Sequence, residues 1–119
     1  MDIFRIYHLQ CARRLSALSD THPCSRLHGH SFRVEVHVSG PVDATLGWVA
    51  DFGEIDAAWQ PIHAALDHRY LNDIAGLENP TSEHLTIWLW DKLKPVLMGL
   101  SKIIVMESHD SGCVYHGKP

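Results

Sequence analysis

The stretch Phe32-Arg33-Val34-Glu35-Val36-His37-Val38 decides how this chain folds. Its apolar residues stand at every second position, and polar residues fill the positions between them. Because successive side chains of a β-strand point to opposite faces, this alternation predicts a strand with one buried and one polar face. Gly40 and Pro41 follow and should end the strand. The remaining chain must therefore supply partner strands and a cover for the apolar face.

Directly upstream lies Cys24-Ser25-Arg26-Leu27-His28-Gly29-His30. If the strand extends back through this segment, His28 and His30 leave the same face and form a ready-made pair of metal ligands. Gly29 between them carries no side chain that could crowd the site. Cys24 lies in the preceding loop, where nearby cations and imidazoles can tune a partly exposed thiol. The alternative is a turn that contains these histidines incidentally.

Length and composition set broad limits on the function. The 119 residues suffice for a single domain, 1–119, with one modest core. A net charge of -4 without a basic cluster argues against nucleic acid as the main partner. The sequence shows no secretion signal and no apolar run near the roughly 20 residues of a membrane span, so we expect a cytoplasmic protein. Three cysteines without CxxC spacing indicate free thiols.

The other elements follow from periodicity and capping. Residues 3–15 favour a first strand, 16–23 a loop, and 102–106 with 114–116 a hairpin. Asp51 followed by Glu54 resembles a capping box that opens a helix, in which Pro61 should produce a kink or a break. Thr81 is a second helix cap. The order strand, strand, helix, helix, strand, strand predicts an α+β fold, with an antiparallel four-stranded sheet and both helices on one face. Its free edges invite oligomerisation.

Three further groups of residues carry chemistry. Asp67-His68 supplies a base and its orienting carboxylate if the loop folds the two together and His68 reaches Cys24. From these residues alone, an Asp that caps a turn beside a solvated His is the preferred interpretation. Glu107 at a strand end can pair with the two parallel donors of a guanine or pterin ring, or it is an ordinary surface glutamate. Thr81 and Ser82 offer hydroxyls and free amides at a helix start, which capping explains equally well.

Five runs together resemble the 6-pyruvoyl-tetrahydropterin synthase family, and they occur in that family's order: CSRLHGHSF from Cys24, GWVADFGEI from Gly47, LDHRYLND from Leu66, ENPTSE from Glu78 and ESHDSGCVYHG from Glu107. The resemblance covers nearly the whole chain. It implies the tunnelling fold, in which the sheets of three subunits join in a barrel. It further implies a homotrimer or homohexamer with active sites at the subunit interfaces.

The resemblance also implies roles for individual residues. Cys24 corresponds to the thiolate that moves protons at the substrate side chain, and Asp67 and His68 to its catalytic partners from a neighbouring subunit. Glu107 corresponds to the anchor of the pterin ring, assisted by Thr81 and Ser82. The three-residue gap between Cys24 and the HGH run is similar to the gap in the bacterial carboxy-forming branch of the family. That branch converts 7,8-dihydroneopterin triphosphate to 6-carboxy-5,6,7,8-tetrahydropterin, acetaldehyde and triphosphate, on the way to queuosine and related 7-deazaguanines.

Two alternatives to that activity stay open. One is a pyruvoyl-forming or side-chain-cleaving enzyme that acts on the same pterin. The other is a pterin-binding paralogue with reduced or no metal-dependent activity. The presence of Cys24, Asp67 and His68 speaks against the second alternative, because a binding module does not need a proton-transfer set.

One departure from the family pattern concerns zinc. The family places a third zinc-binding His at the end of the first strand, where this chain has Arg13, and a guanidinium has no lone pair for a metal. Three accounts stay open. Cys11, two residues earlier on the same strand face, completes a zinc site with His28 and His30; or those two histidines bind zinc weakly alone; or Arg13 replaces the metal and binds the substrate hydroxyls. The last two accounts are preferred, because Cys11 lies about 6 to 7 Å from the Arg13 position along a strand.

Overall fold

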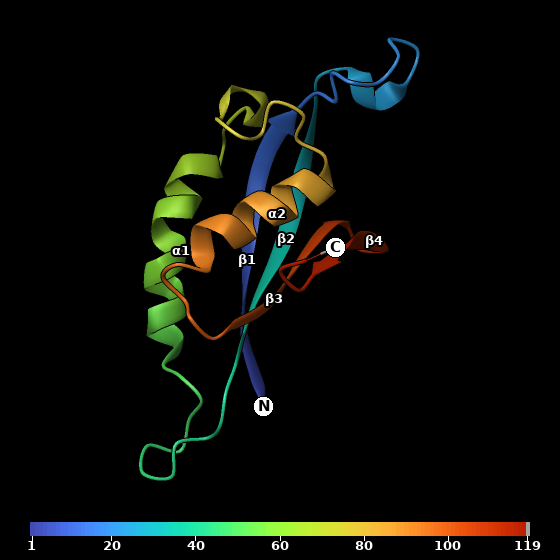
Figure 1. Ribbon diagram of the computed structural model, residues 1–119. Coiled ribbons are helices and arrows are strands. Elements are labelled where there is room, and N and C mark those ends of the chain that lie inside the picture. Colours follow the sequence, from blue (N-terminus) through green and yellow to red (C-terminus); the bar gives the residue numbers. More distant parts are fainter. Residues whose placement is uncertain (119) are drawn as a thin grey trace.

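The computed structural model describes residues 1–118 and contains one antiparallel sheet (Figure 1). Its strands lie in the order β1-β2-β3-β4. They are β1 (Asp2–Arg13), β2 (His28–Ser39), β3 (Leu100–Ser108) and β4 (Ser111–Tyr115), and the two helices α1 (Phe52–Leu66) and α2 (Ser82–Leu93) lie between β2 and β3 in the chain. Two short 3₁₀ turns span Pro23–Ser25 and Leu71–Asp73. The predicted α+β order and sheet are therefore confirmed.

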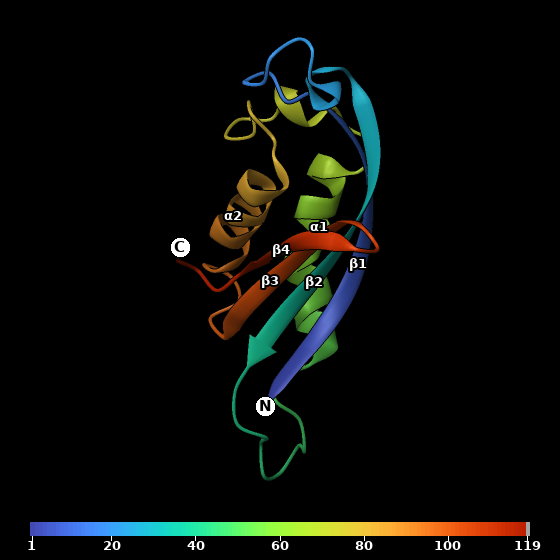
Figure 2. The same ribbon diagram turned by 90° about the vertical axis from the view of Figure 1, so that its right-hand side faces the viewer.

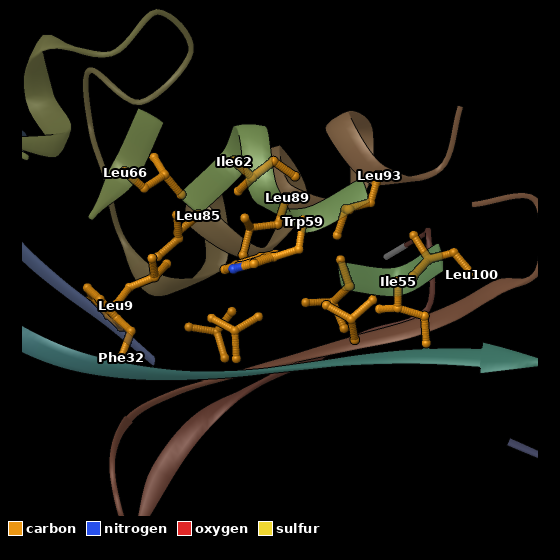
Figure 3. Packing of buried hydrophobic residues seen from close by; sticks show 14 of the residues in the cluster. Leu9, Phe32, Ile55, Trp59, Ile62, Leu66, Leu85, Leu89, Leu93 and Leu100 are labelled. Atoms are coloured by element: carbon orange, nitrogen blue, oxygen red, sulfur yellow. The ribbon is translucent and has the colours of Figure 1, made fainter. Parts of the chain in front are cut away.

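Both helices cover the same face of the sheet, as predicted (Figure 2). Val34, Val36 and Val38 from the alternating run lie on that face and are buried. Figure 3 shows apolar side chains from both helices packed onto those of β1 and β2. The fully buried members include Leu9, Phe32, Ile55, Leu66, Leu85, Leu89 and Leu93. This packing removes the apolar face of each element from water, which is the main favourable term in folding.

Both helices begin at the capping residues that the sequence predicted, Asp51 and Thr81. The Asp51 carboxylate accepts a hydrogen bond from the Gly53 amide at 2.9 Å, and the Thr81 hydroxyl accepts one from the His84 amide at 3.0 Å. Of the predicted kink or break at Pro61, the break is wrong, because α1 continues through this residue to Leu66. A proline removes one intrahelical donor, and the buried contacts of the same helix outweigh that loss.

The register of β1 against β2 positions the functional residues. Arg13 lies opposite His28, and Cys11 lies opposite His30. These four residues share the helix-covered face with the buried pair Leu9 and Phe32, because positions two apart on a strand share a face. Arg13, His28 and His30 thus form a polar cluster that continues the hydrophobic core, which includes Cys11, toward the end of the sheet. Within residues 1–118, no helix is long and apolar enough to cross a membrane.

Candidate active site

The guanidinium of Arg13 is the centre of the polar cluster. Its side chain is only 3% exposed, and its Nη2 donates to Glu107 Oε2 at 2.9 Å. Nη1 donates to the Pro80 carbonyl at 3.1 Å and to Ser82 Oγ at 3.2 Å. The guanidinium carbon also lies 5.2 Å from the centre of the Phe32 ring. β1, the start of α2 and the end of β3 therefore converge on one buried cation.

His28 and His30 also contact this guanidinium. Arg13 Nε lies 3.4 Å from His28 Nε2, and Arg13 Nη2 lies 3.1 Å from His30 Nε2. Because a guanidinium only donates hydrogen bonds, both Nε2 atoms must accept. His28 Nδ1 lies 2.7 Å from the Arg26 carbonyl, which only accepts, so this ring carries its proton on Nδ1. Burial, followed by the charge of Arg13, lowers the pKa of His30 and favours its neutral form.

Glu107 is joined to Ser82 as well as to Arg13. The Ser82 hydroxyl donates to Glu107 Oε2, the same oxygen that accepts from Arg13. These hydrogen bonds, with that of Ser82 the largest cause, lower the pKa of Glu107 and keep it ionised. Thr81 serves as the cap of α2 and bonds the His84 amide. The structure thus brings Ser82 into contact with Glu107, and Thr81 precedes Ser82 in the chain.

Cys11 lies in the core rather than in the polar cluster. Its thiol donates to the Leu66 carbonyl at 3.3 Å, and the residue is 5% exposed. Burial raises the pKa of Cys11 to about 12, so the thiol is protonated at neutral pH. Among the described residues 1–118, no three His, Cys, Asp or Glu side chains are arranged to hold a metal ion. With Arg13 bonded to the two imidazole nitrogens, the donor set does not fit a zinc ion.

Asp67 and His68 form the expected carboxylate–imidazole pair. Asp67 Oδ2 lies 2.8 Å from His68 Nδ1, and Asp67 Oδ1 accepts from the Gln10 amide at 2.8 Å. The contact between these adjacent side chains depends on His68 itself, whose φ of 58° lies in the left-handed region. The His68 amide also bonds the Gln10 carbonyl at 2.6 Å, so the free edge of β1 holds the pair. These hydrogen bonds, led by that of Gln10, lower the pKa of Asp67.

Cys24 lies apart from this pair within one subunit. It belongs to the 3₁₀ turn Pro23–Ser25, half-buried, and its amide donates to His22 Nδ1 at 3.1 Å. Leu15 and Arg14 fix the turn, because the Leu15 amide bonds the Cys24 carbonyl and Arg14 Nε bonds the Ser25 carbonyl. Among residues 1–118, no hydrogen bond joins Cys24 to Asp67 or His68.

Two surface hollows lie near these groups. One of about 470 Å³ is lined by Gln10, Cys11, Ala12, Gly29, His30, Ser31, His68, Arg69 and Tyr70. The other, of about 530 Å³, is lined by His8, Ser31, Arg33, Met106, Glu107, Ser108 and His109. His68 therefore lines one hollow and Glu107 the other, and Ser31 borders both. A ligand held by Glu107 of one subunit does not share a hollow with His68 of the same subunit.

Sequence reasoning missed His63. Its Nε2 lies 3.5 Å from Asp67 Oδ2, and its Nδ1 accepts from Trp59 Nε1 at 3.2 Å. The spacing of four residues from Trp59 to His63 and again to Asp67 was a usable signal, because side chains four apart meet on one helix face. Gln10 was missed because it acts through its backbone, which no side-chain pattern reveals.

Comparison with known proteins gives one consistent family for this chain. Residues 2–118 match the family model described as 6-pyruvoyl tetrahydropterin synthase. The chain is 41% identical over 98 residues to the 6-carboxy-5,6,7,8-tetrahydropterin synthase of Synechocystis sp., covering 77% of this chain and 76% of the relative. It is 34% identical to the dihydroneopterin monophosphate aldolase of Pyrococcus furiosus, covering 72% of this chain and 75% of the relative.

A solved structure of the Caenorhabditis elegans 6-pyruvoyl tetrahydropterin synthase superposes on this chain with a TM-score of 0.91 at 28% identity. The superposition covers 99% of this chain and 96% of the other. Family model, sequence relatives and fold thus agree with the family that the motifs resemble. The chain belongs to the 6-pyruvoyl tetrahydropterin synthase family.

Proposed function

We propose that this protein is a carbon–carbon lyase of the 6-carboxytetrahydropterin synthase type. Its substrate is 7,8-dihydroneopterin triphosphate, which it converts with water to 6-carboxy-5,6,7,8-tetrahydropterin, acetaldehyde and triphosphate. The similarity to the Synechocystis sp. synthase over most of both chains supports this activity. The product leads toward queuosine and other 7-deazaguanines, and we place the reaction in the cytoplasm.

The Asp67–His68 pair is the observation that carries the proposal. Asp67 is fixed by the Gln10 amide and accepts from His68 Nδ1, so the second imidazole nitrogen, Nε2, is free to take or give a proton. The His68 side chain is 76% exposed and therefore open to a group outside its own subunit. In this proposal Cys24 of a neighbouring subunit is that group. The Cys24 thiolate removes a proton from the substrate side chain, and His68 exchanges protons with it.

Glu107 anchors the pterin ring in this proposal. It is ionised, and Oε2 is occupied by Arg13 and Ser82. Oε1 makes no hydrogen bond with the part of the chain that the structure describes, and it can accept from a ring N–H. Ser82 thus assists the anchor by orienting it, with Thr81 holding the helix start in place. The positive charge of Arg13 beside the anchor favours its ionised form.

The assembly completes the site in this proposal. Glu107 and His68 line different hollows of one subunit, and both outer strands of the sheet, β1 and β4, present edges. Pairing between subunits at these edges joins the sheets and brings unlike parts of the site together. We therefore propose a homotrimer or homohexamer. The zinc ion implied by the family resemblance finds no fitting donor set at Arg13, so no step here depends on it.

Product analysis tests the proposed activity. The purified assembly is incubated with 7,8-dihydroneopterin triphosphate, and acetaldehyde, triphosphate and the pterin product are measured by chromatography and mass spectrometry. Acetaldehyde in equal amount to 6-carboxytetrahydropterin supports the proposal. A 6-pyruvoyl product identifies the pyruvoyl-forming reaction, and a pterin with a shortened side chain but no carboxyl group identifies an aldolase-type cleavage. Tight pterin binding without turnover identifies a binding paralogue.

A further inference from the structure

The structure accounts for every hydrogen-bond donor of Arg13. A guanidinium has five N–H groups. Nε serves His28, Nη1 serves the Pro80 carbonyl and Ser82, and Nη2 serves Glu107 and His30. A buried charge with all its donors matched by acceptors is a stable arrangement, whereas an unmatched one is costly. Arg13 is thus a built-in part of the site.

We propose that the Arg13 guanidinium permanently occupies the position that a metal ion needs between His28 and His30, and that this enzyme works without a metal there. This inference deepens the proposed function and rests on it for the identity of the reaction. Of the three accounts that the sequence left open, it selects replacement of the metal by Arg13. In that account Arg13 binds the substrate hydroxyls. In the structure its donors are instead bonded to protein groups.

The two histidines explain why a metal and Arg13 exclude each other. A metal binds imidazole through a ring lone pair, and zinc needs a Zn–N distance of about 2.0–2.1 Å. The Nε2 lone pairs of both rings accept from Arg13, and Nδ1 of His28 holds a proton shared with the Arg26 carbonyl. A zinc ion on the His30 lone pair would overlap the guanidinium nitrogen that lies 3.1 Å from the ring.

The charges around the site favour the guanidinium as well. Glu107 is the one carboxylate bonded to Arg13 among residues 1–118, and it balances a single positive charge. Adding a dication to that pair would bring excess positive charge into a site where the Arg13 side chain is only 3% exposed to solvent. Arg13 cannot neutralise itself by losing a proton, because a guanidinium stays protonated in proteins.

Arg13 is therefore a positioning residue. It holds the anchor carboxylate of Glu107, presents the two imidazoles in defined orientations and supplies a fixed positive charge near the reacting side chain. Such a preorganised charge stabilises developing negative charge without any rearrangement. The pair formed by His28 and His30 is in turn a latent metal site that one substitution can restore.

Metal binding tests this inference without reference to activity. The native protein, Arg13→His and Arg13→Met are expressed in zinc-supplemented medium, and the zinc content per subunit is measured by mass spectrometry. Zinc sulfate is then titrated against each protein in competition with a colorimetric chelator. We expect far less than one zinc per subunit in the native protein and one in Arg13→His. The affinity should rise by more than about 100-fold, since losing even an outer partner of a ligand costs 10–100-fold.

Two controls make the result specific. Arg13→Met removes the guanidinium but supplies no ligand, so it should bind zinc far more weakly than Arg13→His. The double variant Arg13→His with His30→Ala should lose the gained site. Circular dichroism and thermal unfolding establish that each variant is folded. If Arg13→His does not fold, the zinc content of the native protein still decides the question.

One zinc per subunit in the native protein, lost in His28→Ala, would overturn the inference, because Arg13 would then have to leave its position. This failure is distinct from failure of the proposed function. A zinc-containing protein that releases acetaldehyde keeps the function and rejects the inference. A zinc-free protein that binds pterin without turnover rejects the function, and with it metal-free catalysis, but keeps the occupation of the metal position by Arg13.

Discussion

Arg13 Nη2 lies 2.9 Å from Glu107 Oε2, although the two residues are 94 positions apart in the chain. This contact joins the end of the first strand to the end of the third. It also links the residue that departs from the family pattern to the residue that the proposed function assigns to ring binding. Five testable predictions concern this pair, the cysteine thiols and the residues around Asp67.

Removing the cation should destabilise the protein more than neutralising its partner. Arg13→Met leaves the Pro80 carbonyl and two imidazoles without their donor and Glu107 without its cation, and breaking a buried pair from one side costs about 3–5 kcal/mol. Glu107→Gln keeps a hydrogen-bond acceptor for Arg13, and the Glu107 side chain is 35% exposed, so its loss should be smaller. Urea unfolding at fixed protein concentration measures both. Equal losses of unfolding free energy in the two variants would contradict this prediction.

Cys24 and Cys11 should differ in reactivity toward iodoacetamide. Cys11 is buried, and its pKa of about 12 keeps it as the unreactive thiol. Cys24 is half-buried in a surface turn. Peptide mapping of native protein at pH 8 should find Cys24 modified well before Cys11, and Cys11 modified only after unfolding. Rapid modification of native Cys11 would revive the account in which its thiolate binds a metal.

Asp67→Asn should impair turnover with little change in KM. The amide keeps the size of the side chain but lacks the charge that orients and stabilises the His68 imidazolium, so kcat should fall by about 10²–10⁴-fold. Steady-state acetaldehyde release measures this loss. Ser101→Ala, whose hydroxyl bonds the His37 carbonyl away from the site, is a matched control that should keep kcat.

The Asp67 carboxylate should also make the stability of the folded protein depend on pH in a defined direction. The pKa of Asp67 is below its ordinary 3.8 in the folded protein, because the Gln10 amide and His68 stabilise the ionised form. Its contribution to stability is therefore fully present above pH 3.8 and is lost as the pH falls through the lower folded-state pKa. Asp67→Asn should reduce the acid dependence of urea unfolding below that pH. An unchanged dependence would mean that the carboxylate is equally stabilised in the unfolded chain.

His63 should matter far less than His68 for turnover. Its contact with Asp67 is 3.5 Å long, and its side chain is 37% exposed. Exposed pairs of this kind are worth about 0.2–1 kcal/mol, so His63→Gln should change kcat by less than about fivefold. The matched variant His68→Gln should abolish most activity, because it removes the group that exchanges protons. A large effect of His63→Gln on the pH profile would instead assign it a role in setting the protonation of Asp67.

Local patterns predicted most of the fold. The alternation of residues 32–38 gave rise to a strand with a buried and a polar face, and Asp51 and Thr81 cap the helices that they were predicted to cap. These features depend on neighbours a few positions away, so a single sequence contains them. The prediction failed at Pro61, where burial of the surrounding helix outweighed a local preference for a break.

The candidate residues were also recognisable from spacing and motif, but not their partners. The sequence has Arg13 where the family pattern has a zinc-binding His, and it left three accounts of this difference open. The contacts of Arg13 with Pro80, Ser82 and Glu107 join segments that are far apart in the chain, so they require α2 to be packed against the sheet. The left-handed φ of His68, which brings its ring to Asp67, likewise depends on pairing with the edge of β1.

Periodicity, capping and motif order were therefore sufficient for the type and sequence of the elements and for the chemical character of the site. The tertiary structure alone decided which atoms meet: the pairing of Arg13 with His28 and Glu107, and the burial of the Cys11 thiol in the core. The physical reason is that strand register and side-chain packing act between distant segments. They assign each lone pair and each donor to a partner that local sequence does not contain.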